Sequence, residues 1–211
     1  MAESTPYKLA RLVLPVNYDL VLQPDLEKFT FSGHETLELE VVEPTNEIVL
    51  NAIELEIEFQ RLVTGDNTVV AAPTVTVDED LERVSFRFAE ELQPGKVFMD
   101  LAFQGTLNDQ LRGFYRSQYV DDDGTERYLA STQFEATDAR RAFPCWDEPS
   151  FKATFDVTLV VPEALAAISN TAVVSETSAS AGLRTVKFER SPKMSTYLVA
   201  FIVGDMASVE E

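Results

Sequence analysis

Apolar and polar residues alternate along much of this chain with a period of two. In the run from Ile53 to Phe59, the apolar residues are separated by three glutamates. Successive side chains of a strand point to opposite faces, so this run predicts a strand whose apolar side faces the core and whose glutamates face water. The same alternation predicts six further strands, around positions 18–22, 37–41, 84–88, 97–103, 151–159 and 186–188.

Turn-forming residues separate these runs, and helical periodicity is nearly absent. They cluster at positions 43–46, 64–67, 93–95 and 121–124. Strands that recur at this spacing predict an all-β fold, either an antiparallel β-sandwich or a saddle-like arrangement of sheets. We expect residues 1–211 to form a single domain.

One long segment, from Thr132 to Pro149, lacks strand periodicity. Its residues 137–142 predict about one helical turn. An irregular connection of this length inside a compact domain is usually functional. We therefore expect the functional residues to lie on this loop.

The chain is strongly acidic, with 17 Lys and Arg against 36 Asp and Glu and a formal net charge of −19. Such a surface repels phosphate backbones and anionic lipid headgroups, which argues against nucleic acid or a membrane as a partner. It attracts cationic ligands, for example the protonated amino terminus of a peptide. A charge excess that only maintains solubility is the alternative.

The composition favours a cytoplasmic protein. Cys145 is the only cysteine, so no disulfide can form within the chain. Residues 1–20 show no basic head followed by an apolar block, and the longest apolar stretch, residues 197–203, is too short to span a membrane.

No catalytic or metal site is recognisable in the sequence. His34-Glu35 begins like a His-Glu-x-x-His zinc motif, but position 38 is Glu and His34 is the only histidine. The strand pattern directs His34 toward solvent and Glu35 to the opposite face. Cys145 has no histidine partner, and we expect it to be a small buried hydrophobe. The chain is thus predicted to supply no catalytic residue and no metal ligand.

The segment from Ser131 to Pro149, STQFEATDARRAFPCWDEP, is the most distinctive part of the sequence. It resembles the amino-terminal domain of gluzincin zinc aminopeptidases of the aminopeptidase N and puromycin-sensitive type, which carries Gln-x-Glu, then Ala-Arg and Pro-Cys-x-Asp-Glu-Pro. The resemblance covers essentially the whole chain, with further matching segments at 14–18, 31–33, 113–117, 151–155, 169–170 and 194–198.

The resemblance implies a β domain that docks beside a catalytic domain in a larger peptidase. Carried onto this chain, Glu135 would bind the free α-amine of a peptide substrate, and Gln133 would hydrogen-bond its first residue. It also implies zinc in the full-length protein. The zinc-binding and exopeptidase motifs of the family are absent from this chain, so we expect these 211 residues to be inactive and to bind no zinc.

Other readings remain open at this point. On composition alone, Gln133 and Glu135 are ordinary surface residues. We expect Arg140, Asp147 and Glu148 to shape the loop, and Trp146 to be a packing anchor. A noncatalytic scaffold, such as a peptidase-like subunit of the transcription machinery, is the alternative function, although a scaffold has no need of the intact Gln133-Phe134-Glu135.

Overall fold

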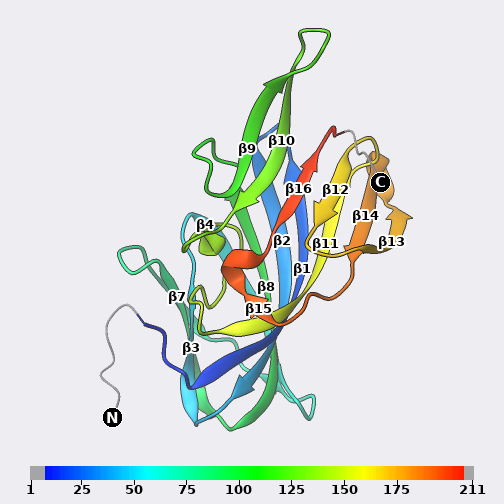
Figure 1. The fold of residues 1–211 in the computed structure, drawn as a ribbon. Coiled ribbons are helices and arrows are strands. Elements are labelled where there is room, and N and C mark those ends of the chain that lie inside the picture. The colour runs from blue at the N-terminus through cyan, green and yellow to red at the C-terminus, as the bar shows by residue number, and fades with distance from the viewer. Residues whose placement is uncertain (1–7, 207–211) are drawn as a thin grey trace.

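The computed structural model describes residues 8–206 and is built almost entirely from strands (Figure 1). Within this range it contains three short 3-10 turns and no longer helix. The turns are η1 (Ala139–Arg141), η2 (Ser180–Gly182) and η3 (Thr196–Leu198). No helix in the described range is long and apolar enough to cross a membrane. The predicted all-β class is confirmed.

The largest sheet has the strand order β13-β14-β11-β1-β2-β8-β4-β5, with β15 also paired to β11. Its strands are β1 (Val13–Asp25), β2 (Thr30–Val41), β4 (Leu55–Thr64), β5 (Val69–Val70), β8 (Gly95–Thr106), β11 (Lys152–Pro162), β13 (Val173–Ser178), β14 (Leu183–Phe188) and β15 (Met194–Ser195). One pair departs from the antiparallel prediction, because β1 and β11 run parallel. These two strands are separated by most of the chain, so no hairpin imposes an antiparallel pairing.

Two smaller sheets complete the fold. A four-stranded sheet has the order β12-β16-β10-β9, and a three-stranded sheet has the order β3-β7-β6. Their strands are β3 (Thr45–Asn51), β6 (Thr74–Asp78), β7 (Arg83–Leu92), β9 (Gly113–Val120), β10 (Glu126–Gln133), β12 (Ala166–Ser169) and β16 (Phe201–Gly204). The β9–β10 hairpin projects beyond the remaining strands (Figure 1).

Both smaller sheets pack on the same face of the large sheet. Phe31 of β2 meets Phe114 of β9 with ring centroids 5.1 Å apart, and Phe59 of β4 meets Phe86 of β7 at 6.2 Å. Phe31 and Glu35 lie on the same face of β2. The register places Leu101 of β8 beside Glu35 and Phe59 of β4 beside Leu101, so Phe59 lies on this face as well. The core therefore lies between one large sheet and two small ones.

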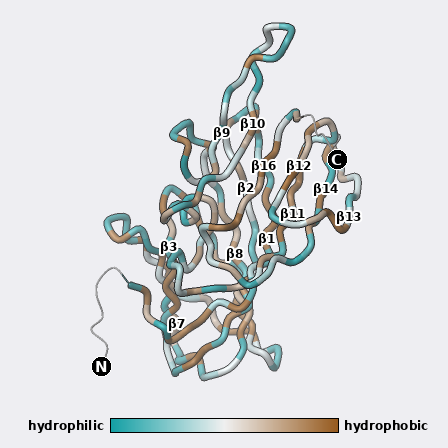
Figure 2. Tube along the Cα trace, viewed as in Figure 1, coloured by the Kyte–Doolittle hydropathy of each residue, from teal (hydrophilic) through white to brown (hydrophobic). Residues whose placement is uncertain are grey.

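The alternation predicted from sequence matches the observed burial, and Figure 2 shows hydrophobic and hydrophilic positions alternating along the strands. In the six other predicted runs, the apolar residues on the inward-facing side of the alternation are all buried. The run 53–59 is only half-buried, and its strand starts at Leu55 rather than Ile53. Glu54 is exposed, as predicted, but it precedes the strand: its φ is 59°, and its carboxylate contacts Arg141 at 2.7 Å.

His34 and Glu35 point to opposite faces of β2, as predicted. His34 is exposed, whereas Glu35 is 0% exposed and faces the core.

Candidate functional site

The candidate site is the loop from Thr132 to Pro149, which leaves the end of β10 and crosses the core side of the large sheet before β11 begins. Its predicted helical turn is present as η1. Ring contacts attach the loop to the sheet, since Phe143 lies 6.0 Å from Tyr18 of β1 in an edge-to-face arrangement. The loop is therefore part of the packed structure, with residues 142–147 all buried.

Gln133 and Glu135 are both exposed and are separated by the buried Phe134. The Phe134 ring packs edge-to-face against Phe143 at 6.0 Å and against Phe201 at 5.9 Å. Gln133 is the last residue of β10, and Glu135 begins the turn that follows, with a cis peptide bond to Ala136. Neither side chain hydrogen-bonds to another residue in the described part of the chain, so both are available to a ligand.

Arg140 connects the middle of the loop to Asp147 near its end and to Glu82 outside the loop. Its Nε donates to Asp147 Oδ2 at 3.0 Å, and its Nη1 donates to Glu82 Oε2 at 2.8 Å. Burial lowers the pKa of Arg140, but hydrogen bonds and charge interactions with these two carboxylates outweigh it, so the pKa is raised overall. These contacts match the loop-shaping role expected of Arg140 and Asp147.

Arg141 makes a second set of ion pairs on the same loop. Its guanidinium contacts Glu54 at 2.7 Å and Asp138 at 2.8 Å, and its side chain is 8% exposed. Gly113 of β9 has a φ of 67°, and a Cβ at that position would lie 2.7 Å from the Cβ of Arg141. Glycine at 113 therefore satisfies both the backbone conformation and the close approach of β9 to Arg141.

Asp147 links the loop to two further elements. Its Oδ1 accepts a hydrogen bond from Thr196 Oγ1 at 2.9 Å, and its backbone N–H donates to Asn51 Oδ1 at 3.1 Å. Asn51 also exchanges two backbone hydrogen bonds with Cys145, at 2.7 and 3.0 Å. Glu148 accepts from the backbone N–H of Leu9 at 2.6 Å, so it too has a structural contact.

Cys145 and Trp146 are packing residues. Cys145 is 0% exposed and Trp146 is 1% exposed, as predicted for both. The backbone N–H of Trp146 donates to Tyr18 Oη at 3.1 Å. Burial raises the pKa of the Cys145 thiol well above its ordinary value, and the nearby Asp147 and Glu35 raise it further. A thiol held in its neutral form is a poor nucleophile.

Residues 8–206 contain no group of three or more His, Cys, Asp or Glu side chains arranged to hold a metal ion. His34 is exposed on the solvent face of β2, and two of the loop carboxylates, Asp138 and Asp147, are already paired with arginines. The side chains present do not fit a zinc site.

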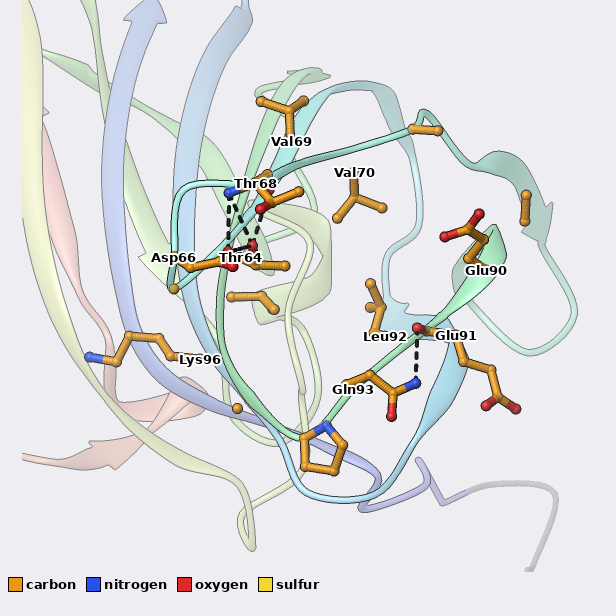
Figure 3. A pocket seen from close by; sticks show the side chains of 16 residues that line it. Thr64, Asp66, Thr68, Val69, Val70, Glu90, Glu91, Leu92, Gln93 and Lys96 are labelled. Carbon is orange, nitrogen blue, oxygen red and sulfur yellow. Dashed lines mark hydrogen bonds between the residues drawn. The ribbon is translucent and has the colours of Figure 1, made fainter.

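A pocket of about 620 Å³ lies away from the loop, between the β4–β5 turn and the β7–β8 turn (Figure 3). The first turn is closed by hydrogen bonds among Thr64, Asp66 and Thr68, and Gln93 donates to the backbone oxygen of Glu91 in the second. Neither Gln133 nor Glu135 lines this pocket. Both residues are exposed on the surface of the loop instead.

Sequence reasoning missed the acidic partners of the loop arginines. Glu82 and Glu54 contact Arg140 and Arg141 from turns far away in sequence. No local pattern marks them, because the chain has 36 acidic residues.

Comparisons with known proteins identify relatives along nearly the whole chain. The model of the peptidase M1 N-terminal domain family matches residues 14–198. Puromycin-sensitive aminopeptidase of Caenorhabditis elegans is 46% identical over 200 residues, covering 94% of this chain and 21% of the relative. Aminopeptidase M1-B of Oryza sativa subsp. japonica is 48% identical over 197 residues, covering 93% and 22%. Aminopeptidase 2, mitochondrial, of Saccharomyces cerevisiae is 40% identical over 203 residues, covering 94% and 21%. The chain spans about a fifth of the length of these curated relatives.

Proposed function

The chain belongs to the peptidase M1 N-terminal domain family, and on that premise we propose that it is the substrate-recognition domain of a zinc-dependent aminopeptidase, a hydrolase that removes residues from peptide amino termini. Glu135 binds the protonated α-amine, and Gln133 hydrogen-bonds the first residue of the peptide. The observation that carries this assignment is an exposed Gln-x-Glu pair on a loop fixed by buried ion pairs.

The chemistry of the two side chains suits an amino terminus. An α-amine has a pKa of about 8, so most peptide amino termini are protonated at neutral pH. A carboxylate that contacts an ammonium forms a charge-assisted hydrogen bond, which is stronger than a neutral one. The net charge of −19 also favours the approach of a cationic group.

Replacing Glu135 by Gln in the full-length enzyme is expected to lower kcat/KM for peptides with a free amino terminus by roughly 10- to 150-fold. Glutamine keeps the size of the side chain but removes its charge, and a lost hydrogen bond to a charged group costs about 1.5–3 kcal/mol. Steady-state kinetics with a series of peptide substrates measures the effect.

Glu126→Gln is the matched control, because Glu126 is an exposed glutamate at the other end of β10. It should leave kcat/KM unchanged. Inhibition by an amino-terminally acetylated peptide should change little in Glu135→Gln, since that ligand never carries the charge. A Glu135→Gln enzyme within twofold of wild type on free-amine substrates would show that Glu135 is not the amine anchor.

The outer face of the four-stranded sheet is the proposed docking face for the catalytic domain of the full-length protein. Ser131 and Gln133 of β10 share this face. The register places Ile202 of β16 beside Ser131 and Ile168 of β12 beside Ile202, so both isoleucines lie on it too. Ile168 is 48% exposed, and Leu111, 62% exposed, lies two residues before the partner of Gln133. The exposed Ile168 on this face and the exposed Leu111 in the bend before β9 favour an interdomain contact.

The 211-residue chain by itself is expected to hold no zinc and to have no aminopeptidase activity. Its only histidine cannot complete a catalytic zinc site, which takes three protein ligands. Elemental analysis after dialysis against zinc, together with a fluorogenic aminoacyl substrate, checks both statements. One tightly bound zinc ion per chain, or turnover above a heat-treated sample, would contradict them.

The comparisons do not favour the noncatalytic scaffold, since the relatives reported above are named as aminopeptidases. A cytoplasmic location is part of the proposal and is supported by the presence of a single, buried cysteine. One relative bears a mitochondrial name, so localisation of the full-length protein is the corresponding experiment.

A further inference from the structure

One carboxyl group faces the core without a partner. Glu35 of β2 is 0% exposed, and neither of its carboxyl oxygens has a hydrogen-bond partner. The strand register places Leu20 of β1 on one side of it and Leu101 of β8 on the other. A slot lined in this way accepts a neutral carboxylic acid much more readily than a carboxylate.

Glu35 lies beneath the Thr132–Pro149 loop. Tyr18 is two residues from Leu20 on the same face of β1, so it is a diagonal neighbour of Glu35. Tyr18 is also the residue on which the loop rests, through the hydrogen bond from Trp146 and the ring of Phe143. Burial is the main reason that the pKa values of Tyr18 and of Cys145 on the loop are raised, and the nearby Glu35 carboxylate raises both further.

The other charged groups around this position do not neutralise Glu35. Asp147 acts on the same Tyr18 and Cys145, and it is negative and already paired with Arg140. On β8, Asp100 points to the opposite face, where it pairs with Arg61. No ion pair involves Glu35 within the part of the chain that the structure describes.

We propose that Glu35 is a pH-sensitive latch for the loop, which stays packed on the large sheet while this carboxyl is neutral and opens more readily when it is ionised. The inference is independent of the proposed aminopeptidase function, although the loop concerned carries Gln133 and Glu135.

The direction of the pH dependence follows from proton linkage. Burial raises the pKa of Glu35 well above its ordinary value in the packed state, whereas an opened loop returns it toward about 4.3. Below the lower pKa both states hold the proton, and packing is most stable. Between the two pKa values only the packed state holds it, so the opening equilibrium constant rises by up to about tenfold per pH unit.

Cys145 provides the readout, because it is the only cysteine and is fully buried in the loop. The rate at which an aromatic disulfide reagent labels Cys145 in the folded chain reports loop opening. The rate of Cys145 labelling is measured from pH 5 to pH 8 for wild type, Glu35→Gln and Glu35→Leu. The reagent concentrations are kept in the range where the labelling rate is proportional to the reagent concentration. The pH dependence of thiol reactivity cancels in the ratio of wild-type to variant rates.

The ratio is expected to rise with pH, by as much as about tenfold per unit, and to level off above the pKa of the packed state. Both variants are references without a titrating side chain at position 35. If Glu35→Gln does not fold, Glu35→Leu provides the reference rate. A ratio that is constant across this pH range in the folded variants would overturn the proposal.

Discussion

An Arg140→Met variant is expected to lose about 3–5 kcal/mol of unfolding free energy, because it leaves a buried carboxylate without its cation. The Asp147 side chain is 1% exposed, and the Arg140 side chain is 12% exposed. In the variant, the Thr196 hydroxyl would remain as the only side-chain donor to Asp147. Urea denaturation followed by the fluorescence of Trp146, the single tryptophan, measures the loss.

Arg87→Met is the control for the same substitution at an exposed ion pair. Arg87 contacts Glu47 at 3.0 Å, with side chains 60% and 33% exposed, so its removal should cost about 0–1 kcal/mol. If Arg140→Met were no more destabilising than Arg87→Met, the Arg140–Asp147 pair would not be what fixes the loop.

Local alternation was sufficient to predict the strands whose apolar side chains are buried. Tyr18 and Leu20 are 1% and 0% exposed, and they belong to one of the runs predicted from the period of two. The parallel pairing of β1 with β11 was not predictable in this way. Alternation shows which face of a strand is buried, but it contains no information about which distant strand lies beside it.

The residues of the candidate site were found through a motif, and their supports were not. The resemblance of residues 131–149 to a known family pointed to Gln133 and Glu135, and both are exposed in the structure. Glu82 and Glu54 could not be selected from sequence, because their pairing with the loop arginines depends on chain reversals. Both residues have positive φ values, 52° for Glu82 and 59° for Glu54. The presence of a glutamate in the sequence gives no indication of such a backbone conformation.

Glu35 marks a different limit of sequence reasoning. The strand pattern predicted that it points away from His34, and this is confirmed. Whether a buried carboxyl meets a cation depends on side chains contributed by other elements, here Leu20 and Leu101. Departures from local rules of this kind often mark functional or strained positions.

A Phe143→Ala variant is expected to lose about 3–5 kcal/mol of unfolding free energy, the cost of removing a large aromatic side chain from a packed core. Phe143 is 0% exposed and its ring lies between those of Tyr18 and Phe134, at 6.0 Å from each. It therefore joins the large sheet to the residue between Gln133 and Glu135. Chemical denaturation monitored by far-ultraviolet circular dichroism measures the change.

Phe98→Ala deletes the same side chain at a half-buried position of β8, where the ring is covered by Lys96 at 5.8 Å. It should cost only about 1 kcal/mol, because much of that ring is already in contact with water. Cys145 labelling should also accelerate strongly in Phe143→Ala and little in Phe98→Ala, since of these two rings it is that of Phe143 that packs the loop against Tyr18. Equal losses in the two variants would mean that Phe143 is no better packed than a peripheral ring, and that the loop is held by its ion pairs and hydrogen bonds.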